Sequence, residues 1–394
     1  MNEFPQKNTV RSKFDSPLVP FLIALILGFS LLLQGLVHSR FNATVFVGAD
    51  VRWSDARVLG PDFIIDKSAG YDGQFYYRLA RDPFTSTRTA HGVTLDVPAY
   101  RQQRILYPVL AWCFSLGQAA WTPWALIAVN LLGFCAIGWF GGAWAQHFGE
   151  HAMWGALPLF HLGFVFSLTG NLAEIVEIAA LLAGLLLVEK RRYALAALWI
   201  GLAILAKETA LLAALAVAGS LIFNQLRSEQ RHRFDFDVLW LLIPLAIYAS
   251  VQLVLQQVWG VWPSLSGSGN IVTPLMALAS YLATALGFTT QSYSSLELVR
   301  TIGLLAAISF IALVAFHIQR SAAAAYLKIA WGMFALLFLS LSEFVLSVDV
   351  HFARAFSECF VLGVLLLLAA PLRTRFMLLF CLGALFYTRS LYTI

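Results

Sequence analysis

Two segments of the chain place acidic and basic side chains at a spacing that suits phosphate binding. Asp72 stands between Tyr71 and Gly73, and Arg101 and Arg104 follow later in the same polar stretch. Residues three positions apart share a face of a helix, so we expect both guanidiniums to point the same way. Paired guanidiniums bind phosphate through parallel hydrogen bonds. The sequence therefore predicts a phosphate site, with lipid-headgroup anchoring by the two arginines as the alternative.

Further charged residues interrupt apolar stretches. Lys207 and Glu208 divide residues 193–223, and His351 and Arg354 open a later apolar segment. Because a charge in hydrocarbon is costly, we expect Lys207 and Glu208 at the tip of a helical hairpin. There they would contact a substrate or, alternatively, neutralise each other. Arg354 is a further phosphate candidate, again with headgroup anchoring as the alternative.

The composition is that of a polytopic membrane protein. Of 394 residues, 60% are hydrophobic, 12% are charged and 14% are aromatic. Soluble domains have roughly 45–50% apolar and about 25% charged residues. The net charge of +5 does not indicate a nucleic-acid partner, because many Lys and Arg residues lie in short links between apolar segments. We expect an all-α fold in which residues 1–394 form one integral membrane domain.

About eleven apolar segments are predicted to span the membrane. They are Pro17–Val37, Trp121–Ala145, Ala152–Thr169, Asn171–Val188, Tyr193–Ala206, Glu208–Phe223, Val238–Trp259, Leu298–Phe316, Ala322–Leu346, Phe352–Ala370 and Phe376–Tyr392. The Lys and Arg bias of the short loops places residues 1–16 in the cytoplasm and residues 38–120 and 260–297 outside. Residues 105–119 are too short to span, and we interpret them as a re-entrant or interfacial helix.

On this topology the polar residues of the spans gather at the outer side. Asn171 and Glu174 stand at one outer hairpin tip, and Lys207 and Glu208 at the next. Such residues are costly in a membrane and mark functional positions. We therefore expect an outward-facing, partly intramembrane cavity.

The segment after Tyr71 is predicted to be a short helix lying on the membrane. Tyr71, Phe75 and Leu79 fall on one helical face, and Pro83 ends the helix. Gly73 allows another group to approach the backbone closely. The four cysteines lie in apolar stretches without a pairing or metal-binding motif, so we predict no metal site and no other cofactor. Dependence on a divalent metal is left open.

Three runs of sequence resemble a known enzyme superfamily. YDGQFYYRLARDP (71–83), YRQQRILYPVLAW (100–112) and AKET (206–209) resemble GT-C integral-membrane glycosyltransferases. More closely, they resemble a bacterial family linked to cell-surface glycopolymer formation. The usual third motif has arginine where this chain has Lys207, which keeps the charge but not the paired donors.

The resemblance implies a GT-C-like bundle that transfers a sugar from a polyprenyl-phosphate donor to a glycan or lipid-linked acceptor. The reaction would be inverting and would face the periplasm from the bacterial inner membrane. Asp72 carries over as the catalytic carboxylate, and Asp96 is the second candidate base. The predicted substrate-binding residues are Tyr71, Gln74, Arg101, Arg104, Tyr107, Asn171, Glu174, Lys207, Glu208, His351 and Arg354.

Two other functions fit part of this pattern. A flippase or transporter of lipid-linked saccharides would use a basic cavity, but we expect it to have polar residues in both leaflets and internal repeats. A non-catalytic component of an envelope glycopolymer complex would not need Asp72.

Overall fold

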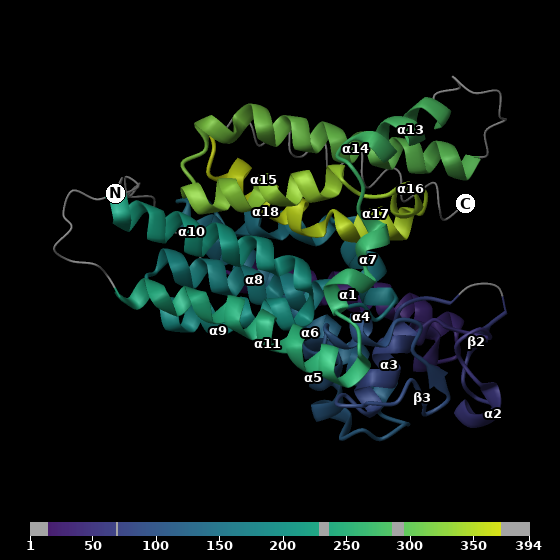
Figure 1. The fold of residues 1–394 in the computed structure, drawn as a ribbon. Coiled ribbons are helices and arrows are strands. Elements are labelled where there is room, and N and C mark those ends of the chain that lie inside the picture. The colour runs from purple at the N-terminus through teal and green to yellow at the C-terminus, as the bar shows by residue number, and fades with distance from the viewer. Residues whose placement is uncertain (1–14, 68–69, 228–235, 286–294, 372–394) are drawn as a thin grey trace.

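The computed structural model describes residues 15–67, 70–227, 236–285 and 295–371, which are mostly helical (Figure 1). Within these residues, five helices are long and apolar enough to cross a membrane. They are α1 (Leu18–His38), α6 (Thr122–His147), α10 (Leu211–Arg227) with the 3-10 turn η3 (Glu208–Ala210), α11 (Ile243–Trp259) with η4 (Phe236–Leu242), and α14 (Ser295–His317) with η6 (Ile318–Arg320).

Two bent helix pairs bring the number to seven if each pair forms one span. They are η2 (Ala152–Phe160) with α7 (Leu162–Thr169), bent by 67°, and α17 (Asp349–Ala355) with α18 (Ser357–Leu368), bent by 46°. The protein is therefore a helical, membrane-embedded protein.

The other predicted spans correspond to shorter helices or fall outside the described residues. α9 (Tyr193–Ala206) and α15 (Ala325–Leu339) are apolar helices below the usual spanning length. α8 (Glu174–Glu189) occupies most of the predicted span 171–188. The predicted span Phe376–Tyr392 lies outside the described residues. Five to seven helices able to span are thus observed, and the count of eleven remains a prediction.

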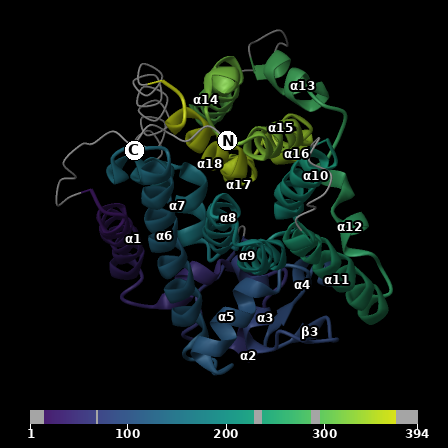
Figure 2. The same ribbon diagram turned by 90° about the vertical axis from the view of Figure 1, so that its left-hand side faces the viewer.

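Helix α8 runs through the middle of the helical region (Figure 2). It packs against α6 and α9, while α10 packs against α15 and α15 against α18. Nearly every residue of α8 is buried, because its Leu, Ile, Val and Ala side chains are apolar on all sides. The acidic residues at its start, Glu174 and Glu177, are therefore carried into the interior.

The polar stretch after α1 folds beside the helical region and shares a core with residues of α6, α8 and α9. Its elements are η1 (Ala43–Val47), β1 (Ala49–Asp50), α2 (Ala56–Leu59), β2 (Ile65–Asp66), α3 (Gly73–Arg81), β3 (Thr89–Ala90), β4 (Val93–Thr94), α4 (Pro98–Gln102) and α5 (Leu106–Ser115). β1 pairs with β2 in parallel, and β3 pairs with β4 antiparallel. We call residues 39–121 the first-loop region. It lies at the lower right of Figure 1.

Helix α3 confirms the predicted helix but not its place on a membrane surface. Every residue from Gly73 to Ala80 is buried, because the helix packs against α5 and α6 in the core of the first-loop region. The predicted close approach at Gly73 is confirmed. A Cβ there would lie 2.4 Å from the carbonyl oxygen of Gly170 and 2.7 Å from that of Val47. Glycine thus lets the start of α3 reach the turn that precedes α8.

The remaining elements follow α11 and α15. α12 (Pro263–Ser266), η5 (Ser268–Asn270) and α13 (Met276–Ala285) form much of the second predicted outer loop, and α16 (Glu343–Leu346) precedes α17. Helix α5 matches the short helix predicted for residues 105–119. It contacts α3 and α6.

Candidate functional site

Asp72 lies at the start of α3 between two arginines that come from distant parts of the chain. Its Oδ1 is 3.0 Å from Nη1 of Arg101, and its Oδ2 accepts a hydrogen bond from Nη1 of Arg354 at 3.1 Å. The side chain makes no capping hydrogen bond to α3. The carboxylate is thus committed to the two guanidiniums and not to its own helix.

Arg101, on α4, joins Asp72 to Asp96. Its Nε and Nη2 donate to the two oxygens of Asp96 at 2.8 and 2.7 Å. Its guanidinium also lies over the ring of Phe75 at 4.5 Å from the centroid. Both candidate bases of the sequence therefore share one arginine.

Arg104 lies just beyond the end of α4 and binds Glu208. Its Nε and Nη2 donate to the two carboxylate oxygens at 2.8 and 2.6 Å. Nη2 also donates to the hydroxyl of Tyr100 at 2.6 Å, and the guanidinium stacks on that ring. The helix that was predicted to carry Arg101 and Arg104 on one face is shorter than expected, because α4 ends at Gln102, before Arg104. Both arginines nevertheless enter the same cluster.

Arg354, on α17, connects the first-loop region to α8. Its Nε and Nη2 donate to Oε1 of Glu174 at 3.0 and 2.7 Å. Its Nη1 donates to the hydroxyl of Tyr71 at 2.6 Å, and its guanidinium carbon lies 5.1 Å from the centre of that ring. Three parts of the chain thus meet at one side chain.

Lys207 and Glu208, predicted at the tip of a helical hairpin, lie at the break between α9 and η3 and do not neutralise each other. α9 ends at Ala206 and Lys207 is extended, so the two side chains find different partners. Nζ of Lys207 is 2.7 Å from Glu358 and 3.9 Å from Glu174. Glu208 instead pairs with Arg104. The mutual-neutralisation alternative is therefore wrong.

The Arg104–Glu208 pair adjoins the other ion pairs at the ring of Tyr100, over which both Arg101 and Arg104 lie, and we call the whole set the ion-pair network. Its members are the cations Arg101, Arg104, Lys207 and Arg354 and the carboxylates Asp72, Asp96, Glu174, Glu208 and Glu358. The side chains of Asp72 and Glu208 are each 21% exposed, whereas those of Glu174 and Glu358 are each 2% exposed. The network thus has a partly exposed, hereafter hydrated, end at Asp72 and Glu208 and a buried end at Glu174 and Glu358.

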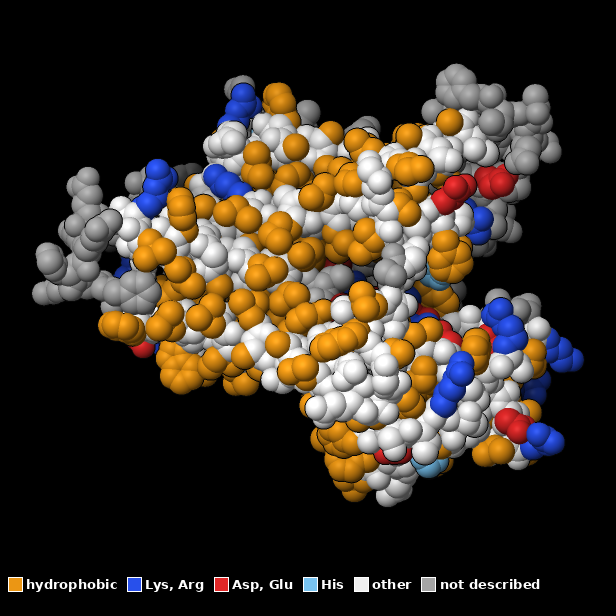
Figure 3. All heavy atoms as spheres, viewed as in Figure 1, with side chains coloured by type: hydrophobic (Ala, Val, Ile, Leu, Met, Phe, Trp, Pro, Cys, Tyr) orange, Lys and Arg blue, Asp and Glu red, His pale blue; other side chains and the backbone are white. Residues whose placement is uncertain are grey.

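The space-filling view places charged side chains at the base of a recess. The recess lies between the helical region around α16 and the first-loop region (Figure 3). A ligand that enters this recess could therefore reach the more exposed end of the network.

The pKa of Asp72 lies well below its usual range. Burial raises it, but the positive charges of Arg101, Arg354 and Arg104 lower it by more. The pKa of Arg101 is correspondingly raised, because Asp72 and Asp96 outweigh the effect of its burial. Asp72 is therefore an ionised hydrogen-bond acceptor at neutral pH.

Three predicted substrate-binding residues are buried and hydrogen-bonded within the protein. The side-chain oxygen of Gln74 accepts from the backbone N–H of Asp50 and from the hydroxyl of Ser54. The hydroxyl of Tyr107 donates to the backbone of Leu126 and lies near Asn171. Gln74, Tyr107 and Asn171 are buried. Within the described residues their side chains make no hydrogen bond to a charged member of the ion-pair network, and substrate binding by them remains a prediction.

His351 lies at the edge of the site. Its ring stacks on Tyr71, with the ring centres 5.7 Å apart and the planes inclined by 27°. Tyr71 in turn contacts Arg354. Two predicted residues are thus placed beside the network, in contact through their ring faces.

Sequence reasoning missed Glu358, Thr209 and Tyr100. Oε1 of Glu358 accepts from Lys207 at 2.7 Å and from the hydroxyl of Thr209 at 2.6 Å. An acidic residue inside the predicted span 352–370 was a signal for Glu358, because unpaired charges are rare in spans. Nothing in the sequence marked Tyr100 as a partner of Arg104.

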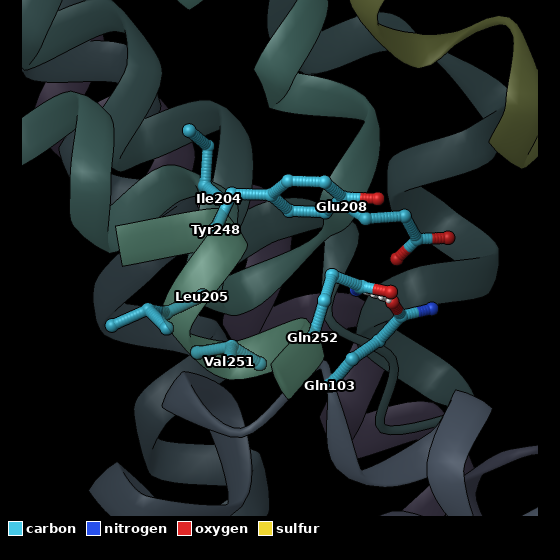
Figure 4. A pocket seen from close by; sticks show the side chains of 7 residues that line it. All are labelled: Gln103, Ile204, Leu205, Glu208, Tyr248, Val251 and Gln252. Atoms are coloured by element: carbon cyan, nitrogen blue, oxygen red, sulfur yellow. Dashed lines mark hydrogen bonds between the residues drawn. The ribbon is translucent and has the colours of Figure 1, made fainter. Parts of the chain in front are cut away.

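A narrow pocket lies beside Glu208 (Figure 4). It is lined by Gln103, Ile204, Leu205, Glu208, Tyr248, Val251 and Gln252. The amide of Gln252 donates to Gln103 at 3.0 Å. The pocket thus joins apolar walls of α9 and α11 to the carboxylate that holds Arg104.

The described residues contain no group of three or more His, Cys, Asp or Glu side chains arranged to hold a metal ion. Comparisons of the chain with protein-family models, with curated proteins and with solved structures give no match. The resemblance to GT-C glycosyltransferases therefore remains an expectation from the three sequence motifs.

Proposed function

We propose that this protein is an inverting, polyprenyl-phosphate-dependent glycosyltransferase of GT-C type, with its site on the periplasmic face of the bacterial inner membrane. The observation that carries the proposal is the position of Asp72. It is a partly exposed, ionised carboxylate held between guanidiniums at the hydrated end of the ion-pair network. A hydroxyl acceptor needs a base, and a departing phosphate needs fixed cations.

The donor phosphate is assigned to Arg101 and Arg104. A phosphate must replace the carboxylates that already occupy these guanidiniums. The side chains of Asp96 and Glu208 are 20% and 21% exposed, so once displaced they can be rehydrated. Glu174 and Glu358 are buried and would be left as uncompensated charges, at a cost of several kcal/mol. Arg354 and Lys207 are therefore assigned to fixing these inner carboxylates.

The transfer is a single displacement at the anomeric carbon of the donor. The acceptor oxygen forms a bond to that carbon as its proton passes to Asp72. The bond between the carbon and the phosphate oxygen breaks, and its electron pair stays on the phosphate. Arg101 and Arg104 stabilise the charge that develops there. Asp72 then releases the proton to water, which restores the carboxylate.

The test compares cells that lack the protein with cells that carry the wild type, Asp72→Asn or Asp62→Asn. Asp62 is an exposed aspartate in the same loop and is outside the network, so it is a matched control. Mass spectrometry of the surface polysaccharide should show one glycosyl addition lost in the deletion and Asp72→Asn strains. Asp62→Asn should restore the addition. A glycan unchanged by deletion would refute the proposal, and full restoration by Asp72→Asn would refute the role of the base.

A further inference from the structure

The rings of Phe344, His351 and Tyr71 form a row. It runs from the protein surface to Tyr71, which precedes Asp72 in the sequence. Phe344 is 66% exposed. Its ring centre lies 5.4 Å from that of His351, which in turn lies 5.7 Å from that of Tyr71. Tyr71 is bonded to Arg354, which contacts Asp72. We call Phe344, His351 and Tyr71 the aromatic row.

Two rings of the row, those of His351 and Tyr71, are held by hydrogen bonds. The His351 ring makes a hydrogen bond to the backbone of Phe344. The hydroxyl of Tyr71 accepts from Arg354, and its ring face lies against that guanidinium. Rings fixed in this way lose little conformational entropy when a ligand packs on them.

The surroundings of Phe344 argue against simple contact with lipid tails. Glu343 precedes it in the short helix α16 and is also exposed. A carboxylate is strongly disfavoured in hydrocarbon, so this part of the chain lies in water or among headgroups. Asp349 lies at the start of the next helix and is partly exposed. The row therefore exposes the ring of Phe344, which follows Glu343 in α16, while His351 and Tyr71 stack on each other and Asp349 faces Arg300.

These features match one class of ligand. A pyranose ring has a face of C–H groups and an edge of hydroxyls. The C–H groups carry partial positive charge and pack on the electron-rich faces of aromatic rings. The hydroxyls can donate to carboxylates such as those of Glu343 and Asp349.

We infer that the aromatic row binds a pyranose ring of the acceptor and directs its hydroxyl to Asp72. This inference rests on the proposed function. Asp72 has one oxygen toward Arg101 and the other toward Arg354. In a single displacement, the acceptor oxygen and the leaving phosphate lie on opposite sides of the anomeric carbon. With the phosphate at Arg101 and Arg104, the acceptor enters from the side of Arg354, where the row ends.

The experiment measures binding of methyl pyranosides to the full-length protein in lipid nanodiscs by saturation-transfer NMR. The variants are Phe344→Ala, Phe344→Trp and the control Phe84→Ala, an 80% exposed phenylalanine in the first-loop region. Phe344→Ala should weaken binding of the best pyranoside roughly 3–10-fold, and Phe344→Trp should keep it. Phe84→Ala should have no effect. Affinity for a synthetic polyprenyl phosphate should be the same in all variants.

The outcomes separate this inference from the proposed function. Unchanged pyranoside binding in Phe344→Ala would overturn the inference, as would weakened polyprenyl-phosphate binding, which would place the donor on the row. Thermal unfolding in lipid shows whether Phe344→Ala has a folding defect. If it has, the Phe344→Trp variant provides the test. Loss of sugar binding in a stably folded Phe344→Trp protein would also overturn the inference. Pyranoside binding that depends on Phe344, together with no glycan difference on deletion, would refute the transferase but leave the row as a sugar site.

Discussion

Asp72 and Arg354 stand 282 positions apart in the sequence and form an ion pair with Nη1 and Oδ2 at 3.1 Å. The contact joins the first-loop region to the late helix α17. Arg354 also donates a hydrogen bond to Glu174 at the start of α8. One guanidinium therefore fixes the position of Asp72, the proposed base, relative to the helical region.

Asp72→Asn should reduce sugar transfer by about 10²–10⁴-fold, the usual contribution of a general base. Folding should persist, because Arg101 keeps Asp96 and Arg354 keeps Glu174 as partners. Transfer and polyprenyl-phosphate binding are measured side by side in nanodiscs, with Asp62→Asn as the control. A variant that binds the lipid and still transfers at the wild-type rate would exclude Asp72 as the base.

Arg101→Gln should move the acid limb of the pH–rate profile to higher pH. The lowered pKa of Asp72 keeps the carboxylate ionised, so the active form is lost only as the pH falls through that low value. Removing Arg101 removes the largest of the charges that lower the pKa, which must then rise. The ionised Asp72 also stabilises the folded state. This contribution is present above the unfolded pKa of about 4 and is lost as the pH falls below it. An acid limb that does not move would contradict this coupling.

Glu208→Gln and Arg104→Ala should have opposite effects on phosphate binding. Glu208 occupies both donors of Arg104 that a phosphate would use, so its neutralisation should tighten binding of a synthetic polyprenyl phosphate. Arg104→Ala should weaken binding roughly 10–100-fold through loss of a charge-assisted contact of about 1.5–3 kcal/mol. Arg104→Lys should restore binding only in part. Weaker binding in both Glu208→Gln and Arg104→Ala would show that the pair acts only as a structural unit.

Glu177→Leu should be tolerated, whereas Glu174→Leu should destabilise the fold. Glu177 is fully buried, and neither of its carboxyl oxygens has a hydrogen-bond partner within the described residues. Glu174 instead compensates Arg354 and Lys207. Removing one partner of a buried ion pair costs roughly 3–5 kcal/mol. Thermal unfolding in lipid should therefore rank Glu174→Leu far below Glu177→Leu, and equal losses would contradict the assignment.

Cysteine labelling tests the topology. In a Cys113→Ser background, which removes an exposed thiol, a cysteine at Ser86 should react with an impermeant maleimide added to intact cells. A cysteine at Lys190, beyond the other end of α8, should react only after permeabilisation. Labelling of both positions in intact cells would refute the predicted orientation.

The sequence predicted the membrane-embedded helical class and the members of the network near the sequence motifs. Composition and apolar runs identify candidate helices because hydrophobicity depends on each residue alone. Local spacing marked Asp72, and Gly73 was expected to allow a close approach for steric reasons that do not depend on the partner.

Tertiary structure decided which charges meet. Arg104 binds Glu208, 104 positions away, and Lys207 binds Glu358, 151 positions away. Such pairs depend on how α4, α9, η3 and α18 pack, and local periodicity contains no information about that packing. The same limit applies to Gln74 and Tyr107, because only the tertiary structure shows that these polar residues of the motifs are buried. Helical spacing showed that α3 has an apolar face. Only the tertiary structure showed that this helix is covered by protein on every side.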